Sequence, residues 1–321
     1  MNKSLVTAAM LLPCFLAHSQ EADEPGGAAE LNVIARAEYL YSDPLGNTSL
    51  YTLLEGSLSE HFSYSVSNHW LSSTPGSLYT NTFRSDDVNW LDWAYLTYSE
   101  GAFDVNLGKM PLLWGTYEFD EYDYDIHLPF ASSVWNCMNS YQWGLSVTYN
   151  YSEWGRLEAG VSTSPYGEHF FTSGLYSFGA RAVAEGDFLS SRIAYYGFQT
   201  GDGLQGALSA GIRSNILDNL SLTFDVQTVV GSDEYVLVAG QTASMAVDYA
   251  PSDEIGLRLY TGFERNQELE MNTDTAGALV AWSPLENVRL HALCAYKWGN
   301  EEISSALQFS VGLTCSFGKK W

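Results

Sequence analysis

The chain has 321 residues and a formal net charge of -24 at pH 7, and 14% of its residues are aromatic, including 21 Tyr and 10 Trp. This charge, without a basic stripe to neutralise phosphates, excludes nucleic acid as a partner. No window after the first residues holds roughly twenty consecutive uncharged apolar residues, which excludes a membrane-spanning helix. The surplus of Tyr and Trp is typical of outer-membrane barrels with aromatic girdles, although a soluble β-protein can show similar totals.

The N-terminus has the pattern of a secretory signal peptide. Lys3 supplies the charged region, Leu5 to Leu16 are mostly apolar, and Ala17-His18-Ser19 fits a small-x-small cleavage site. A lipoprotein signal at Leu11 to Cys14 is the alternative, but proline beside the cysteine is a poor match. The expected divisions are a signal peptide at 1–19, a short lead at 20–30 and a single transmembrane β-barrel at 31–321.

Sixteen segments that alternate polar and apolar residues follow the lead, as expected of strands with one wet face and one apolar face. Most have about the ten-residue length that a tilted strand needs to cross a bilayer. The predicted strands are 31–42, 49–59, 62–71, 89–98, 102–110, 141–150, 156–163, 173–184, 187–198, 205–213, 220–230, 234–249, 255–265, 274–283, 288–298 and 305–317.

The connections between these segments provide an independent test. Bacterial barrels have short turns on the periplasmic side and long loops outside, so the connections after even-numbered strands should be short. They are compact and rich in turn-forming residues, whereas both long connections, 72–88 and 111–140, follow odd-numbered strands. The alternation therefore favours an even strand count and an up-and-down barrel.

The polar face of each strand is expected to line the lumen. On this basis half of the chain's 14 basic residues point inward. The predicted basic ladder consists of Arg36, Arg181, Arg192, Arg213, Arg258, Arg289 and Lys297.

The connection 111–140 is the third outward loop, and it is expected to fold into the barrel and narrow the pore. The predicted constriction residues are Lys109, Glu118, Asp120, Glu121, Asp123 and Asp125. Carboxylates facing an arginine wall would create a transverse field that tunes ion preference. In the alternative interpretation the loop is a lid over the barrel mouth, and the arginines pair with lumen carboxylates such as Glu38, Glu158 and Asp225.

No metal, cofactor or catalytic site is expected. Glu121, Asp123 and Asp125 alternate, but no turn glycine and no closing glutamate follow at the spacing of a calcium loop. The cysteines lack metal-ligand spacing, and no histidine stands beside a serine or aspartate in a catalytic motif. The sequence therefore gives no indication of an enzyme.

The last predicted strand, 305–317, shows the alternation most clearly. After Ser305, one parity is entirely apolar: Leu307, Phe309, Val311, Leu313, Cys315 and Phe317. The interleaved residues are small or polar, so one face would meet lipid and the other a water-filled lumen.

Three stretches resemble the phosphate-selective porin O and P family: Leu91 to Tyr98, Gly101 to Lys109 and Leu113-Trp114-Gly115. The resemblance implies a sixteen-stranded trimeric barrel whose phosphate selectivity depends on lysines at the constriction and on an arginine ladder leading to them. Five of the predicted ladder arginines, Arg181, Arg192, Arg213, Arg258 and Arg289, would be that ladder's counterpart. This chain departs from the pattern, because only Lys109 is available and the loop is acidic, which puts phosphate selectivity in doubt.

These features together predict an all-β, antiparallel, transmembrane barrel of about 16 strands in the bacterial outer membrane. Its expected function is passive diffusion of small hydrophilic solutes and ions through a water-filled pore, with a weak cation preference from the acidic loop. Its partners would be membrane lipid, the solutes and, from the resemblance, two further copies in a homotrimer. The alternative is a closed barrel that acts as a structural or surface-binding protein through its acidic, aromatic loops.

Overall fold

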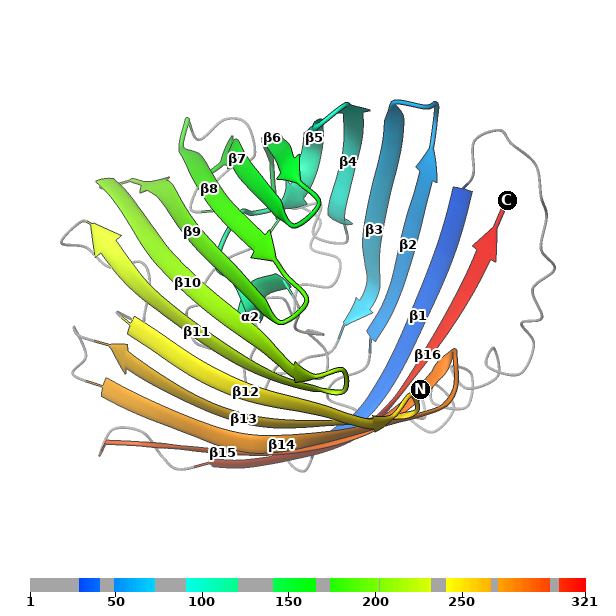
Figure 1. Cartoon of the computed structure of the whole chain (residues 1–321), viewed down its shortest axis with the longest axis vertical. Coiled ribbons are helices and arrows are strands. Elements are labelled where there is room, and N and C mark those ends of the chain that lie inside the picture. Colours follow the sequence, from blue (N-terminus) through cyan, green and yellow to red (C-terminus); the bar gives the residue numbers. More distant parts are fainter. Residues whose placement is uncertain are drawn as a thin grey trace.

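In a computed structural model, the chain forms a closed barrel of sixteen antiparallel strands (Figure 1). The structure describes residues 29–40, 49–72, 91–120, 141–165, 174–201, 203–231, 241–266, 271–300 and 306–321. Each strand pairs with its sequence neighbours, and β1 pairs with β16 to close the ring. The predicted fold class and strand number are confirmed.

Each of the sixteen strands overlaps one predicted segment, although several ends differ by a few residues. The strands are β1 (Ala29–Leu40), β2 (Ser49–Ser57), β3 (Phe62–Ser72), β4 (Leu91–Glu100), β5 (Phe103–Pro111), β6 (Tyr141–Ser152), β7 (Gly155–Thr163), β8 (Tyr176–Glu185), β9 (Leu189–Thr200), β10 (Gly203–Leu217), β11 (Leu220–Gly231), β12 (Gln241–Ser252), β13 (Ile255–Asn266), β14 (Met271–Leu285), β15 (Val288–Gly299) and β16 (Ala306–Lys320). A short helix, α2 (Tyr117–Asp120), follows β5. Among the described residues, no helix is long and apolar enough to cross a membrane.

Short turns follow the even-numbered strands, as predicted, and define the turn end of the barrel. They cover residues 58–61, 101–102, 153–154, 186–188, 218–219, 253–254 and 286–287. In the turn between β4 and β5, Gly101 has a φ of 59°, in the left-handed region that glycine adopts without strain. The opposite end, to which the other connections belong, is the loop end.

Several strands run further toward the turn end than predicted, because the ladder resumes after an irregularity. Register shifts lie at Asn150/Ser152, Asn215/Leu217, Tyr249/Ser252 and Trp282/Leu285. Pro251 and Pro284 lie inside two of these shifts, where a residue without a backbone N–H is tolerated. The predicted start of β12 at 234 falls outside the described residues, which resume at Gln241.

The two faces of the sheet have opposite character. On the outer face, Leu107, Leu259 and Leu307 are 60%, 61% and 65% exposed. On the inner face, Arg36 and Glu38 are 1% exposed. A wide exposed apolar surface around a charged interior is the pattern of a barrel that spans a membrane.

Aromatic pairs mark both edges of the apolar surface. At the turn end, the ring centroids of Phe62 and Tyr98 are 5.0 Å apart, and those of Phe103 and Tyr149 are 4.8 Å apart. At the loop end of β15, Tyr296 stacks on Trp298 at 5.5 Å. Their positions match the two aromatic girdles expected at membrane interfaces.

The two ends of the described chain meet at the turn end. The amide of Ala29 donates to the carbonyl of Trp321 at 3.2 Å, and the amide of Trp321 donates to the carbonyl of Ala29 at 2.8 Å. Lys320 and Glu30 form an ion pair at 3.4 Å. β16 therefore continues three residues beyond the predicted end at Phe317, because β1 already begins at Ala29 and gives it partners.

A side-chain clasp crosses the closure between β1, β16 and β15. Gly312 of β16 is in register with Glu38 of β1 on one side and with His291 of β15 on the other. His291 Nε2 lies 3.3 Å from Glu38 Oε1, so the two side chains meet over the glycine. A Cβ on Gly312 would overlap His291, and the glycine is therefore the residue that permits the clasp.

Candidate pore interior

The basic ladder lies on β1, β8, β9, β10, β13 and β15, on the inner face of the barrel. Arg36, Arg192 and Arg258 are buried, at 1%, 7% and 7% exposure. Arg213 is partly exposed and its Nε donates to Thr223 Oγ1 at 3.0 Å. Lys297 is partly exposed near the loop end of β15.

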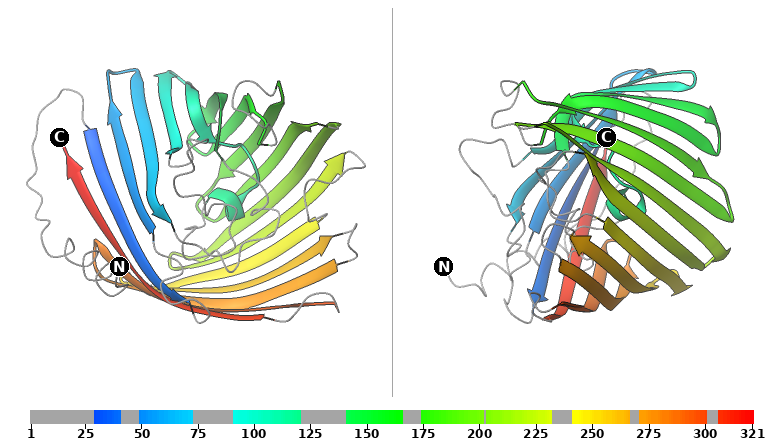
Figure 2. Two further views of the ribbon diagram at one scale, coloured as in Figure 1. Left: turned by 180° about the vertical axis from the view of Figure 1, so that it is seen from behind. Right: turned by 90° about the vertical axis from the view of Figure 1, so that its left-hand side faces the viewer.

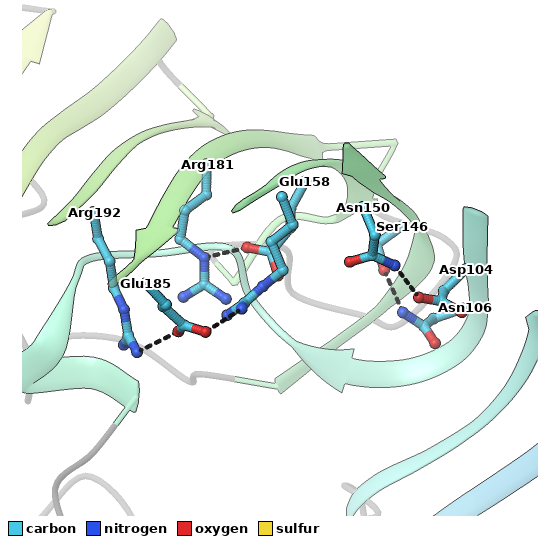
Figure 3. Close-up of polar contacts among 9 residues, drawn as sticks. Asp104, Asn106, Ser146, Asn150, Glu158, Arg181, Glu185 and Arg192 are labelled. Carbon is cyan, nitrogen blue, oxygen red and sulfur yellow. Dashed lines mark hydrogen bonds and ion pairs between the residues drawn. The ribbon is translucent and has the colours of Figure 1, made fainter. Parts of the chain in front are cut away.

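An ion-pair network occupies the inner face of β7, β8 and β9 near the turn end (Figure 3). Glu158 accepts from Arg156 Nε at 3.1 Å and from Arg181 Nε. Glu185 lies 3.1 Å from Arg156 Nη1 and 3.3 Å from Arg192 Nη2. The network alternates cation and anion along three strands, and its guanidinium groups outnumber its carboxylates.

Two members of this network were missed in the sequence. Arg156 shares the parity of Glu158 on a predicted strand, so the signal was present. Glu185 was assigned to a turn, because the strand was predicted to end at residue 184, whereas β8 includes it.

Further carboxylates pair with the ladder elsewhere. Asp248 forms an ion pair with Arg258, with Oδ1 2.8 Å from Nε and Oδ2 3.0 Å from Nη2. Arg258 and Arg289 line a cavity of about 390 Å³ at the turn end of β10 to β15. Glu38 lies 3.7 Å from Arg36. The arginine wall is therefore partly neutralised by carboxylates of the wall itself.

The first residues of the third loop dock on the inner wall. Asp225 of β11 accepts a hydrogen bond from Thr116 Oγ1 and another from the Glu118 amide at 2.8 Å. Figures 1 and 2 show α2 inside the ring of strands. The alternative interpretation paired Asp225 with arginines, whereas its described hydrogen bonds are to the loop.

Two aromatic side chains anchor this part of the loop. Trp114 packs edge-on against Tyr196, with ring centroids 5.5 Å apart, and lies 6.2 Å from Phe198. The Tyr117 ring lies under two guanidinium groups, 4.3 Å from Arg192 and 4.6 Å from Arg213. Each such cation–π contact contributes about 0.5–2 kcal/mol, depending on desolvation.

Glycines on the inner wall make room for the docked loop. A Cβ on Gly211 would overlap Asp225 Oδ1 and lie 2.8 Å from Tyr117 Cδ2. A Cβ on Gly179 would lie 3.1 Å from Leu113 Cβ. The sequence did not predict that these two glycines lie under the docked loop. Parity identifies the glycines that face inward, but it does not say which loop residues reach them.

The predicted constriction residues are described only in part. Lys109 is buried, lies in register with Ala94 and Trp143, and donates from Nζ to the carbonyl of Leu91. Glu118 is buried and is held through its backbone amide. The Asp120 side chain and the whole of Glu121, Asp123 and Asp125 lie outside the described residues, so their place at the constriction stays a prediction.

Comparison with known proteins gives matches of structure only. No family model matches the sequence, and no curated protein matches it. The barrel is similar to the outer membrane channel DcaP of Acinetobacter baumannii, with a TM-score of 0.63 at 12% identity over 94% of this chain and 100% of that one. It is also similar to the anion-selective porin from Comamonas acidovorans, with a TM-score of 0.65 at 10% identity. That match covers 91% of this chain and 100% of the porin. A trimer form of OmpT from Vibrio cholerae gives 0.57 at 10% identity, again over 91% and 100%. The chain shares the fold of outer-membrane porins and channels over nearly its whole length.

Proposed function

We propose that this chain is a bacterial outer-membrane porin through which small hydrophilic solutes and ions diffuse passively. The observation that carries the proposal is a closed barrel with an apolar outer face and a charged inner wall on which a loop segment, 113–118, is docked. Such a barrel needs no catalytic group, because selection depends on the width of the pore and on the charges that line it. We infer a non-enzymatic role.

The docked segment supports a constriction formed by the third loop. Residues 113–118 are held on the inner wall, and the acidic run Asp120 to Asp125 continues directly from them. We propose that these carboxylates face the arginine ladder across the narrowest part of the pore. Because wall carboxylates already neutralise several arginines, the acidic loop would give the pore a weak preference for cations.

Three finer assignments belong to the same proposal. The resemblance of residues 91–115 to the phosphate-selective porin O and P family suggests a relationship to that group. That resemblance and the trimer form of OmpT support a homotrimer. Residues 1–19 would serve as the signal peptide that directs the chain to the outer membrane.

Conductance of the refolded protein in a planar bilayer tests the function. Stepwise ohmic openings are expected, and under a salt gradient the reversal potential should show a weak preference for cations. A variant that lacks residues 121–138 should conduct more than the wild type, because the narrowing segment is removed. A matched deletion within the outer connection 73–90 is the control for loop removal as such.

Two results would contradict the proposal in different ways. A silent bilayer, with a barrel shown to be folded by its resistance to heat in detergent, would favour the closed surface-binding barrel. Equal conductance with and without residues 121–138 would be consistent with the porin function, but it would show that the third loop does not form the constriction.

A further inference from the structure

Basic residues are absent from one side of the inner wall. The strands β2 to β6 contain no arginine, and their one lysine, Lys109, is buried against the carbonyl of Leu91. The strands β7 to β15 carry the ladder arginines other than Arg36, together with Arg156 and Lys297. The inner wall is therefore divided by charge around the ring, in addition to any field from the loop.

The inner face of β2 to β5 carries aromatic and acidic side chains and no arginine. We call this surface the acidic aromatic strip, and its members are Tyr51, Glu55, Asp92, Trp93, Tyr95 and Asp104. All but Asp92 share the inner face through register: Tyr51 is paired with His69, Glu55 with Ser65, and Ser65 with Tyr95. Asp92 lies at a register shift and reaches this face through its contacts with Ser67 and His69. The described side chains of the strip, apart from Asp92, are partly or fully exposed, so the lumen can reach them.

Glu55 is the centre of the strip. Trp93 Nε1 donates to Ser65 Oγ at 2.8 Å, and Ser65 Oγ donates to Glu55 Oε1 at 3.0 Å. Ser65 on β3 thus links the indole of Trp93 on β4 to the carboxylate of Glu55 on β2, and Tyr95 lies on the same strand as Trp93, in register with Ser65. Within the described part of the chain Glu55 has no basic partner, in contrast to Glu38, Glu158, Glu185 and Asp248.

Two further carboxylates continue the strip along the pore axis. On the side of the loop end, Asp92 Oδ1 lies 2.5 Å from His69 Nδ1, and its Oδ2 accepts from Ser67 at 3.3 Å. Near the turn end, Asp104 accepts from the hydroxyl of Ser99 at 2.6 Å. It also accepts from the amide of Asn150 at 2.9 Å (Figure 3). Asp104, like Glu55, has no arginine or lysine partner among the described residues.

We propose that the acidic aromatic strip binds small organic ammonium ions that carry a ring, and guides them along the β2 to β5 side of the pore. The inference rests on the proposed diffusion function and names the solute class that this wall favours. An ammonium group is attracted both by a carboxylate and by the face of an aromatic ring, and Glu55 and Trp93, joined through Ser65, offer one of each. The solute's own ring can stack on Tyr95, in the same register row as Glu55, or on Tyr51, nearer the loop end.

Other solute classes fit this wall less well. An anion would meet the carboxylates of Glu55 and Asp104 with no guanidinium group on β2 to β6, and it would be drawn to the opposite wall instead. A neutral solute would make the ring contacts but would have no electrostatic attraction to the Glu55 carboxylate. The division of the inner wall therefore separates paths for cations and anions.

Block of the ionic current by defined probes in a planar bilayer tests the inference. Benzylammonium carries both a ring and a cation, methylammonium only the cation, and benzyl alcohol only the ring. Benzylammonium should block at a lower concentration than either of the others. Glu55→Gln and Trp93→Ala should each raise the half-blocking concentration by about two- to fivefold, as exposed ion pairs and cation–π contacts imply. Trp93→Phe, which keeps a ring face, should retain most of the block.

The control is Glu286→Gln in the β14–β15 turn, which removes the same charge from an exposed position outside the strip. The inference is overturned if Glu55→Gln and Glu286→Gln behave alike, or if benzyl alcohol blocks as well as benzylammonium. Calorimetric titration of the folded barrel in detergent with the same three probes measures binding without conduction. A silent bilayer would thus reject the porin function, while the titration would still decide whether the strip binds ring-bearing ammonium ions.

Discussion

Gly211 sets how closely the third loop can approach the inner wall. Its missing side chain leaves the space in which Asp225, Thr116 and Tyr117 meet. Close packing of this kind is sensitive to a single methyl group, because neither the strand nor the anchored tyrosine can move freely.

We predict that Gly211→Val displaces the docked segment. Overpacking should lower the free energy of unfolding by about 1–3 kcal/mol, and the undocked loop should leave a wider or noisier pore. Thermal denaturation in detergent and single-channel conductance measure the two effects.

Gly256→Val on β13 provides the comparison, since a Cβ there would meet nothing within 4 Å. If the free energy of unfolding falls equally in the two variants, Gly211 is important as a residue of the strand and not because the loop docks against it.

At the scale of elements, three neighbouring strands share one ion-pair network. Glu158 on β7 accepts from Arg156 on its own strand and from Arg181 on β8, and Glu185 extends the network to β9. Removing one carboxylate therefore leaves two guanidinium groups facing the lumen without their shared partner.

We predict that Glu158→Gln shifts the reversal potential toward anions and lowers the free energy of unfolding by about 1–3 kcal/mol. Glu153→Gln, in the turn before β7, makes the same charge change outside the network. Reversal potentials measured under one salt gradient compare the two. An unchanged potential in Glu158→Gln would show that these arginines do not act on the permeating ions.

The clasp between β1 and β15 allows a test of closure. Gly312→Val should push His291 away from Glu38 and lower the free energy of unfolding by roughly 1–3 kcal/mol. In a His291→Ala background the same substitution should cost less, because the overlapping ring is gone, and a double-mutant cycle of thermal stabilities measures this coupling. Strictly additive losses would argue that valine disturbs the strand and not the clasp.

The strands were predictable and their ends were not. Alternation with a period of two is local information, so all sixteen segments were found from the sequence. The ends of β10, β12 and β14 depend on register shifts between neighbours. The predicted strands stop at residues 249 and 283, before Pro251 and Pro284, although the ladder continues beyond both prolines. Glu185 was missed for a similar reason, since the predicted strand stopped one residue before it.

At the scale of the whole molecule, parity predicted the inward face of each ladder arginine once a barrel was assumed. The docking of Thr116 and Glu118 on Asp225 was not predictable, because it depends on the path of a loop across the lumen. The acidic aromatic strip was also missed, since its members are spread over β2 to β5 and only the register aligns them.

The meeting of Ala29 and Trp321 has a consequence for the order of the chain. Their mutual backbone hydrogen bonds lie at the end of the barrel where every other hairpin turn lies, so β16 and β1 resemble one more hairpin whose turn is missing. We predict that a circular permutant, with a short linker from Trp321 to Ala29 and new termini between Asp218 and Asn219, refolds to a barrel of the same conductance. Failure to refold would mean that the native start and finish of synthesis matter to assembly. Successful refolding would mean that the barrel does not depend on which strand comes first in the chain, because β16 and β1 pair in the same way as any other two neighbouring strands.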